Sequence, residues 1–200
     1  SLLEKAGFIE LEQADHARGF VDPTFGTIVE LHRRVTSCAR LFPLDVDATW
    51  KRRQTGAGLV KWVPSSEDLL VHLSLHAAFQ HGLVLRLVQF LDFRRLLERE
   101  PPDPALLAEV AVGARAVGAV ALALEAAQAV VGAPLGPALQ RLVSTWLPSG
   151  LRGHVAQLRA DPAAFLVPSE PPLAWVRWEL AAGRRMVLIR ETLSPSSFSA

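Results

Sequence analysis

Cysteine is almost absent from this sequence, which has Cys38 alone among 200 residues. A single cysteine cannot form an internal disulfide, which excludes a disulfide-stabilised secreted scaffold and favours a reducing compartment. A signal peptide is also absent, because Glu4 and Lys5 stand inside what would have to be its apolar core. We therefore predict a cytoplasmic protein.

A large excess of either charge is missing as well. Twenty-one Lys and Arg face twenty Asp and Glu, so no overall field attracts nucleic acid or acidic membranes. Cations cluster locally at residues 32–34, at Arg40 and at residues 51–53. The sequence places no interleaved aromatics or helix-turn-helix pattern with them, so we do not expect DNA to be read. Two interpretations of these cations stay open: they bind a nucleoside triphosphate, or they are ordinary surface charge.

The longest apolar stretch, residues 110–131, is not a membrane span. It has about the length of a span but contains Arg115, Glu125 and Gln128 and is dominated by Ala and Gly. The stretch is typical of a buried helix, and we predict no membrane partner. A nucleophile triad is equally unsupported, since no G-x-S-x-G is present and Cys38 has no identifiable base.

The patterns that are present predict an α+β protein. A strand-like, turn-rich part covers residues 1–64, and a helical part covers 65–200. "HARGFVD" and "TIVELHRRV" flank "PTFG", which is typical of an antiparallel hairpin. "SLLEKAGF" reads as a helix end closed by Gly7, and "LVKWV", residues 59–63, as a further strand.

Beyond Pro64 the apolar period changes to that of helices. Ser65 or Ser66 is the predicted N-cap, with Glu67 and Asp68 favourable in the first turn. This helix extends to Gly82, and another begins near Val84 and ends before "PPDP". Helices are expected at about 103–115 and 116–132, two more after Pro137, and a last one from "LAWVRWELAAG" onward.

Glu30 and His32 form the polar side of the predicted strand in "TIVELH". They alternate with Val29 and Leu31, as a half-buried strand requires, and share their face with Ile28. The polar face is compatible with solvent, with a cleft or with a neighbouring domain.

The helix after "PSSED" carries His72, His76 and His81. His72 and His76 lie one turn apart on one face, a geometry that can offer two imidazoles to a metal. Leu73 occupies the position where a zincin has its catalytic Glu, and no third ligand is evident. A hydrogen-bonded histidine at a domain seam is the stronger interpretation of His76, with a helical histidine metalloprotein as a distant alternative.

The next helix carries Arg86 and Asp92 among apolar residues. Asp92 can pair with Arg95 one turn on, while Phe90 and Phe93 suggest that its carboxylate is partly buried. A structural ion pair, with Arg95, Arg86 or a histidine of the preceding helix, is favoured over a role in binding a ligand.

The order of these features resembles an uncharacterised nucleotidyltransferase family related to the polymerase-beta-like fold. The resemblance covers about residues 2–135 and rests on "LLEKAGF", a hairpin ending in "VELH", and "EDLLVHLSLHAA" followed by "LDF". It implies metal-dependent transfer of a nucleotidyl group from a nucleoside triphosphate to an acceptor. In such enzymes a Gly-Ser turn holds the triphosphate, and an Asp-x-Asp pair with a third acid binds two ions, typically Mg²⁺.

Carried over by position, the resemblance makes Glu30 the third acid, both catalytic and metal-binding. His32 lies two residues on, where it would touch the acceptor or a phosphate. The candidate substrate-binding residues are His32, Arg33, His76, Arg86 and Asp92.

The chain departs from the family pattern at its beginning. It has no Gly-Ser turn before an Asp-x-Asp strand, and "DVD" at 45–47 follows "VELH" in a loop-like context. In the family the pair precedes "LLEKAGF", so we expect it upstream of Ser1 and the present chain to be inactive alone. The alternative is a noncatalytic nucleotidyltransferase-like module that binds a partner. The acceptor is not identified by the sequence.

Overall fold

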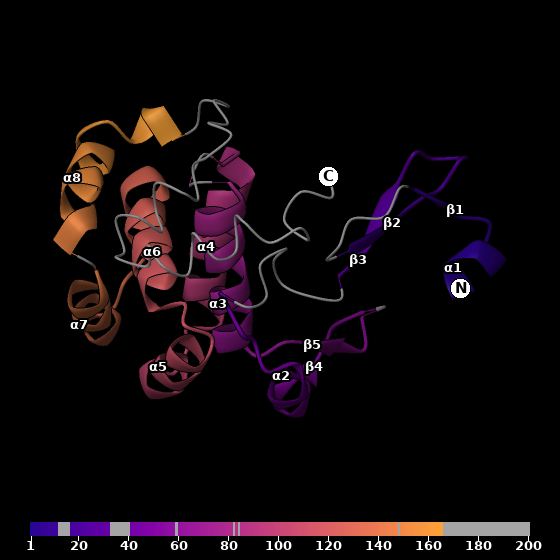
Figure 1. Ribbon diagram of the computed structural model, residues 1–200, viewed down its shortest axis with the longest axis horizontal. Coiled ribbons are helices and arrows are strands. Elements are labelled where there is room, and N and C mark those ends of the chain that lie inside the picture. The colour runs from indigo at the N-terminus through magenta and orange to yellow at the C-terminus, as the bar shows by residue number, and fades with distance from the viewer. Residues whose placement is uncertain are drawn as a thin grey trace.

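The computed structural model describes residues 1–11, 17–32, 41–58, 60–81, 83, 85–147 and 149–165, and the fold is α+β as predicted (Figure 1). A part with two small sheets contains α1 (Leu2–Lys5), β1 (Ile9–Glu10), β2 (Ala17–Val21), β3 (Ile28–His32), α2 (Val46–Arg52), β4 (Gln54–Thr55) and β5 (Trp62–Val63). The helical part contains α3 (Ser66–Leu75), the π-helical η1 (His76–Gln80), α4 (Leu87–Arg99), α5 (Pro104–Gly113), α6 (Val117–Val131), α7 (Pro137–Trp146), η2 (Ser149–Leu151), α8 (Arg152–Ala160) and η3 (Pro162–Phe165).

The predicted hairpin is confirmed. Strands β2 and β3 are antiparallel, with Gly19 opposite Glu30 and Ala17 opposite His32. Gly26 adopts a φ of 67° at the turn, the left-handed region in which glycine is favoured. The sequence did not predict β1, which adds antiparallel to β2 and leaves β3 at the edge of the sheet.

Gly7 also has the predicted left-handed conformation after α1, with a φ of 90°. Two other predictions before residue 64 need correction. Only Trp62 and Val63 of the predicted strand 59–63 are strand, paired with β4, and Leu59 lies outside the described residues. "DVD" is not a loop, because the side chain of Asp45 accepts a hydrogen bond from the backbone N–H of Ala48 and caps α2.

The helix start after Pro64 is confirmed, with Ser65 as N-cap and its hydroxyl bonded to the backbone N–H of Asp68. The helix changes to π-helical hydrogen bonding at His76, which the sequence did not predict. The following helix begins at Leu87 rather than near Val84, which lies outside the described residues. Arg86 is extended (φ −69°, ψ 147°), so its backbone cannot belong to the helix.

Helix α6 lies at the centre of the helical part, between α3 and α4 on one side and α7 and α8 on the other (Figure 1). Every residue from Gly118 to Ala127 is buried, and the many alanines let neighbouring helices approach closely. Much of the apolar stretch 110–131 is buried as predicted, but Val112 is 62% exposed, and the stretch is divided between α5 and α6 at Arg115, whose φ is 54°.

Leu41 and Phe42 belong to the same apolar core as the helices, although they precede α2 in the sequence. The predicted division of the chain into residues 1–64 and 65–200 stays a prediction. Within the described residues, no helix is both long and apolar enough to cross a membrane.

Candidate functional site at the β3–α3 seam

Glu30 and His32 lie on the same face of β3, as their alternation predicted. The Nε2 atom of His32 lies 3.3 Å from the Oε2 atom of Glu30. The strand is more exposed than expected, because only Val29 is half-buried and Leu31 is exposed. Its position at the edge of a three-stranded sheet accounts for this exposure.

His72, His76 and His81 form a row of imidazoles, here called the histidine row. The rings of His72 and His76 are stacked with their centroids 6.4 Å apart, as expected for residues one turn apart in α3. The rings of His76 and His81 meet edge to face at 4.6 Å. In a regular α-helix, residues five apart would diverge by about 140°. The π-helical turn η1 supplies five-residue hydrogen bonding and so brings His81 to the same face.

The turn is closed by Leu83, which is buried and has a φ of 67°. Its backbone N–H donates to the carbonyl oxygen of Ala77, 2.8 Å away. Glycine is the usual residue in this left-handed conformation, because a Cβ atom is disfavoured there. A buried leucine there is strained, and such strain persists only where surrounding packing holds it.

Two histidines of the row, His72 and His76, lie close enough to β3 for its charged groups to affect their pKa values. Burial lowers the pKa of His76 to about 4, assisted by the positive charges of His81, His72 and His32. The carboxylate of Glu30 acts on the same group in the opposite direction. Burial followed by the charge of His32 also lowers the pKa of His72.

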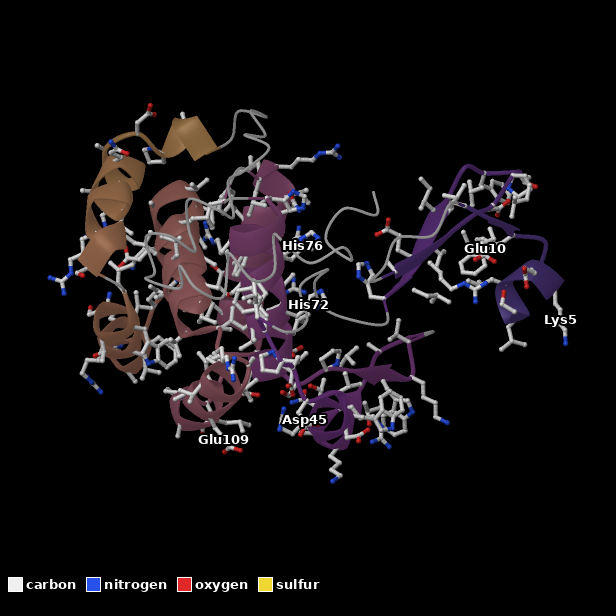
Figure 2. The ribbon with its side chains drawn as sticks, viewed as in Figure 1. Lys5, Glu10, Asp45, His72, His76 and Glu109 are labelled. Atoms are coloured by element: carbon white, nitrogen blue, oxygen red, sulfur yellow. The ribbon has the colours of Figure 1, made fainter. Side chains whose placement is uncertain are left out.

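The structure therefore brings Glu30, His32, His72 and His76 within electrostatic reach of one another. Figure 2 shows His72 and His76 on the edge of the helical part that faces β2 and β3. At neutral pH the two row histidines are uncharged and can accept hydrogen bonds, whereas Glu30 supplies a negative charge.

Glu30 offers a carboxylate ligand for a divalent cation at this seam. Glu30 has an accessible carboxylate, 62% exposed, and carboxylate oxygens are the ligands that Mg²⁺ prefers. In the part of the chain that the structure describes, no three His, Cys, Asp or Glu side chains are arranged to hold a metal ion. Glu30 thus fits as a single ligand, and the histidine row by itself forms no such cluster there.

The other predicted site residues do not join this group. Arg86 is exposed at the start of α4, where its backbone N–H donates to the side chain of Gln89. Asp92 was expected to be partly buried but is exposed, with Arg95 at 4.0 Å. Phe90 and Phe93 form the buried stripe of α4 and turn Asp92 away from the core. Arg33 lies outside the described residues, and its predicted role stays a prediction.

Sequence reasoning missed a buried acid at the start of α3. Asp68 was expected only to favour the helix dipole, but its side chain is 1% exposed and pairs with Arg52. It also accepts hydrogen bonds from the hydroxyls of Ser65 and Thr49. The partner in α2 lies 16 residues away, and no local pattern signals such a pair.

The expected lack of aromatics beside the cations was also wrong. Arg53 lies against the rings of Trp50 and Trp62, with Lys61 next to the second ring. The signal in the sequence was "WKRR" at residues 50–53 followed by "KW" at residues 61–62, which becomes informative once β4 and β5 are known to pair.

A family model described as an uncharacterised nucleotidyltransferase matches residues 1–132, from α1 through the end of α6. No curated protein and no solved structure matches the chain. The match covers more than half of the 200 residues and agrees with the predicted resemblance over about 2–135. This chain therefore belongs to the uncharacterised nucleotidyltransferase family.

Proposed function

We propose that the protein takes part in transfer of a nucleotidyl group from a nucleoside triphosphate to an acceptor hydroxyl. The acceptor oxygen would bond to the α-phosphorus, the bond from that phosphorus to the bridging oxygen would break, and pyrophosphate would leave. Membership in the nucleotidyltransferase family supports this reaction class. The supporting observation in the structure is the accessible carboxylate of Glu30 opposite uncharged imidazoles.

Glu30 is the residue we assign to metal binding. Mg²⁺, when bound, would supply positive charge to the attacking and leaving oxygens of the displacement. Glu30 protrudes from an edge strand and is not needed for packing, so it is free to serve a ligand. In this proposal the remaining metal-binding carboxylates come from an Asp-x-Asp pair of the family type.

The imidazoles have separate roles in this proposal. His32 shares the face of Glu30 and would contact a phosphate or the acceptor. His76 is uncharged at neutral pH and can accept a hydrogen bond from the acceptor hydroxyl, whereas a charged side chain there could only donate.

The test uses the full-length gene product with an α-labelled nucleoside triphosphate, Mg²⁺ and a pool of cellular acceptors. Transfer of label and release of pyrophosphate are measured together. We expect Glu30→Gln to lower turnover by about 100-fold or more, since charge stabilisation at a phosphoryl centre is lost. Glu30→Asp keeps a carboxylate and should retain measurable turnover.

Glu98→Gln is the matched control, because Glu98 is an exposed acid on α4 whose partner is Arg94. It should leave turnover unchanged. Unaltered turnover in Glu30→Gln would remove Glu30 from the proposal. Binding of nucleotide by the full-length protein without any transfer would favour the noncatalytic module instead.

A further inference from the structure

Arg53 is held between two exposed tryptophans on the side of the molecule formed by α2, β4 and β5. Its guanidinium carbon lies 4.6 Å from the ring centroid of Trp50 and 4.7 Å from that of Trp62. Both distances are within the range of cation–π attraction. Trp50 is 58% exposed and Trp62 is 40% exposed, so each indole also presents surface to solvent. We call Trp50, Lys51, Arg53, Lys61 and Trp62 the tryptophan–cation patch.

The backbone explains why these side chains meet. Helix α2 ends at Arg52, and Arg53 turns into an extended conformation that leads directly to β4. Pairing of Thr55 with Trp62 folds β5 back onto this junction. Nη1 of Arg53 donates to the backbone carbonyl oxygen of Trp50, 2.6 Å away, which fixes the guanidinium against the last turn of α2.

The Nε atom of Arg53 is buried and has no hydrogen-bond partner among the described residues. The aromatic faces therefore attract the guanidinium where its Nε atom makes no hydrogen bond. Such an arrangement is preorganised, because the cation and both rings are already in place before a ligand arrives.

The free charge of this region is positive. Lys61 has its ammonium 5.7 Å from the ring of Trp62, and Lys51 lies in the last turn of α2. Arg52 is not available, since Asp68 holds it. Among the acids near α2, Asp45 and Asp47 lie at its opposite end, while the charge of Glu109 on α5 reaches Arg52 in its last turn.

We propose that the tryptophan–cation patch binds single-stranded nucleic acid. Unpaired bases stack on exposed aromatic rings, and cations placed between the rings contact the phosphates that join successive bases. A duplex hides its base faces and could use only the cations. The patch suits a polynucleotide better than a membrane, because Arg53 lies between the two rings and Lys61 lies beside one of them, instead of bordering a continuous apolar face.

This binding does not depend on nucleotidyl transfer. None of the patch residues lies on β3, α3 or η1, so a failure of either proposal leaves the other intact.

The experiment measures fluorescence anisotropy of labelled oligouridine and oligodeoxythymidine of about 12 nucleotides, with the full-length protein at about 50 mM salt. We expect binding of the single strands and at least ~10-fold weaker binding of the corresponding duplex. Trp50→Leu and Trp62→Leu should each weaken single-strand binding by about 10-fold, whereas Trp50→Phe should stay within about threefold. The double variant Lys51→Gln, Lys61→Gln should reduce the salt dependence of single-strand affinity, because fewer phosphates are neutralised.

Phe25→Leu and Arg141→Gln are the matched controls. Phe25 is 82% exposed in the turn between β2 and β3, and Arg141 is an exposed cation on α7, so neither should change affinity. Circular dichroism melts of every variant establish that the fold is retained.

Three results would overturn the proposal. The first is no binding of any single strand, and the second is equal affinity for single strand and duplex. The third is single-strand affinity unchanged in Trp50→Leu. Binding of phosphatidylserine vesicles in place of oligonucleotides, lost in Trp50→Leu, would identify the patch as a membrane surface and likewise reject it.

Discussion

Arg52 donates two parallel hydrogen bonds to the carboxylate of Asp68, from Nε at 2.8 Å and from Nη2 at 2.7 Å. The pair joins the last turn of α2 to the first turn of α3. Asp45, labelled in Figure 2, lies at the other end of α2. Burial raises the pKa of Asp68, but the hydrogen bonds from Arg52 and the two hydroxyls outweigh it and lower the pKa below 3.8. The pair therefore holds α2, and the patch at its end, against the helical core.

Asp68→Ala should destabilise the protein strongly. The change leaves the Arg52 guanidinium without its counter-charge and opens a gap at the start of α3. Removal of one partner from a buried pair costs about 3 kcal/mol of unfolding free energy. Urea unfolding measures the loss, and Asp92→Ala, which removes the exposed pair with Arg95, should cost less than about 0.5 kcal/mol. A loss below about 1 kcal/mol for Asp68→Ala would show that the pair contributes little.

His76 should make stability depend on pH. Its pKa in the folded protein, about 4, is below the ordinary 6.5, so the unfolded chain binds the proton first as pH falls. The stabilising effect of neutral His76 is complete above pH 6.5 and is lost progressively as pH falls toward 4. Because the ring is half-buried, we expect a loss of about 1–2 kcal/mol in unfolding free energy over this window.

The measurement is urea unfolding of the wild type and of His76→Gln between these two pH values. His72 contributes in the same direction, so the variant should show a shallower dependence and not a flat one. Identical pH dependence in the two proteins would contradict the low pKa of His76.

Glu125 and Arg159 should respond unequally to substitution. Glu125 lies buried in α6, while Arg159 on α8 is largely exposed and donates to it at 2.6 Å. Arg159→Ala strands a buried carboxylate and should cost about 2–3 kcal/mol. Adding Glu125→Gln to that variant removes the charge and should restore part of the loss.

Thermal unfolding, followed by circular dichroism, compares these two variants with Arg95→Ala. This control removes the exposed ion pair between Arg95 and Asp92. If the double variant were no more stable than Arg159→Ala, the stranded charge would not be the cause of the loss.

The local part of the fold could be predicted from the sequence. Alternation placed Glu30 and His32 on one face, "PTFG" indicated the hairpin, and Ser65 indicated the helix start, because each depends on neighbours within a few residues. The bounds of the helices between residues 100 and 160 were close for the same reason, whereas the predicted last helix, from "LAWVRWELAAG" onward, lies outside the described residues.

Relationships between distant residues could not be predicted in this way. The partner of Asp68 lies in another helix, and Trp62 reaches Arg53 only through a short hairpin that has weak strand patterns. Asp92 was misplaced because its apolar neighbours in sequence lie on the opposite face of α4. In each case tertiary packing, which a linear pattern does not contain, decided the surroundings of the side chain.

The π-helical turn after α3 makes the geometry of the histidine row sensitive to the number of residues in that turn. The alignment of His81 with His76 depends on how many residues the turn contains, because the turn is wider than the helix before it. Regular helical winding over the same five residues would leave the two imidazoles about 140° apart, whereas loss of one alanine would set them four residues apart, which again places them on one face of a helix. The spacing of the chain is therefore as much a part of this site as its side chains are.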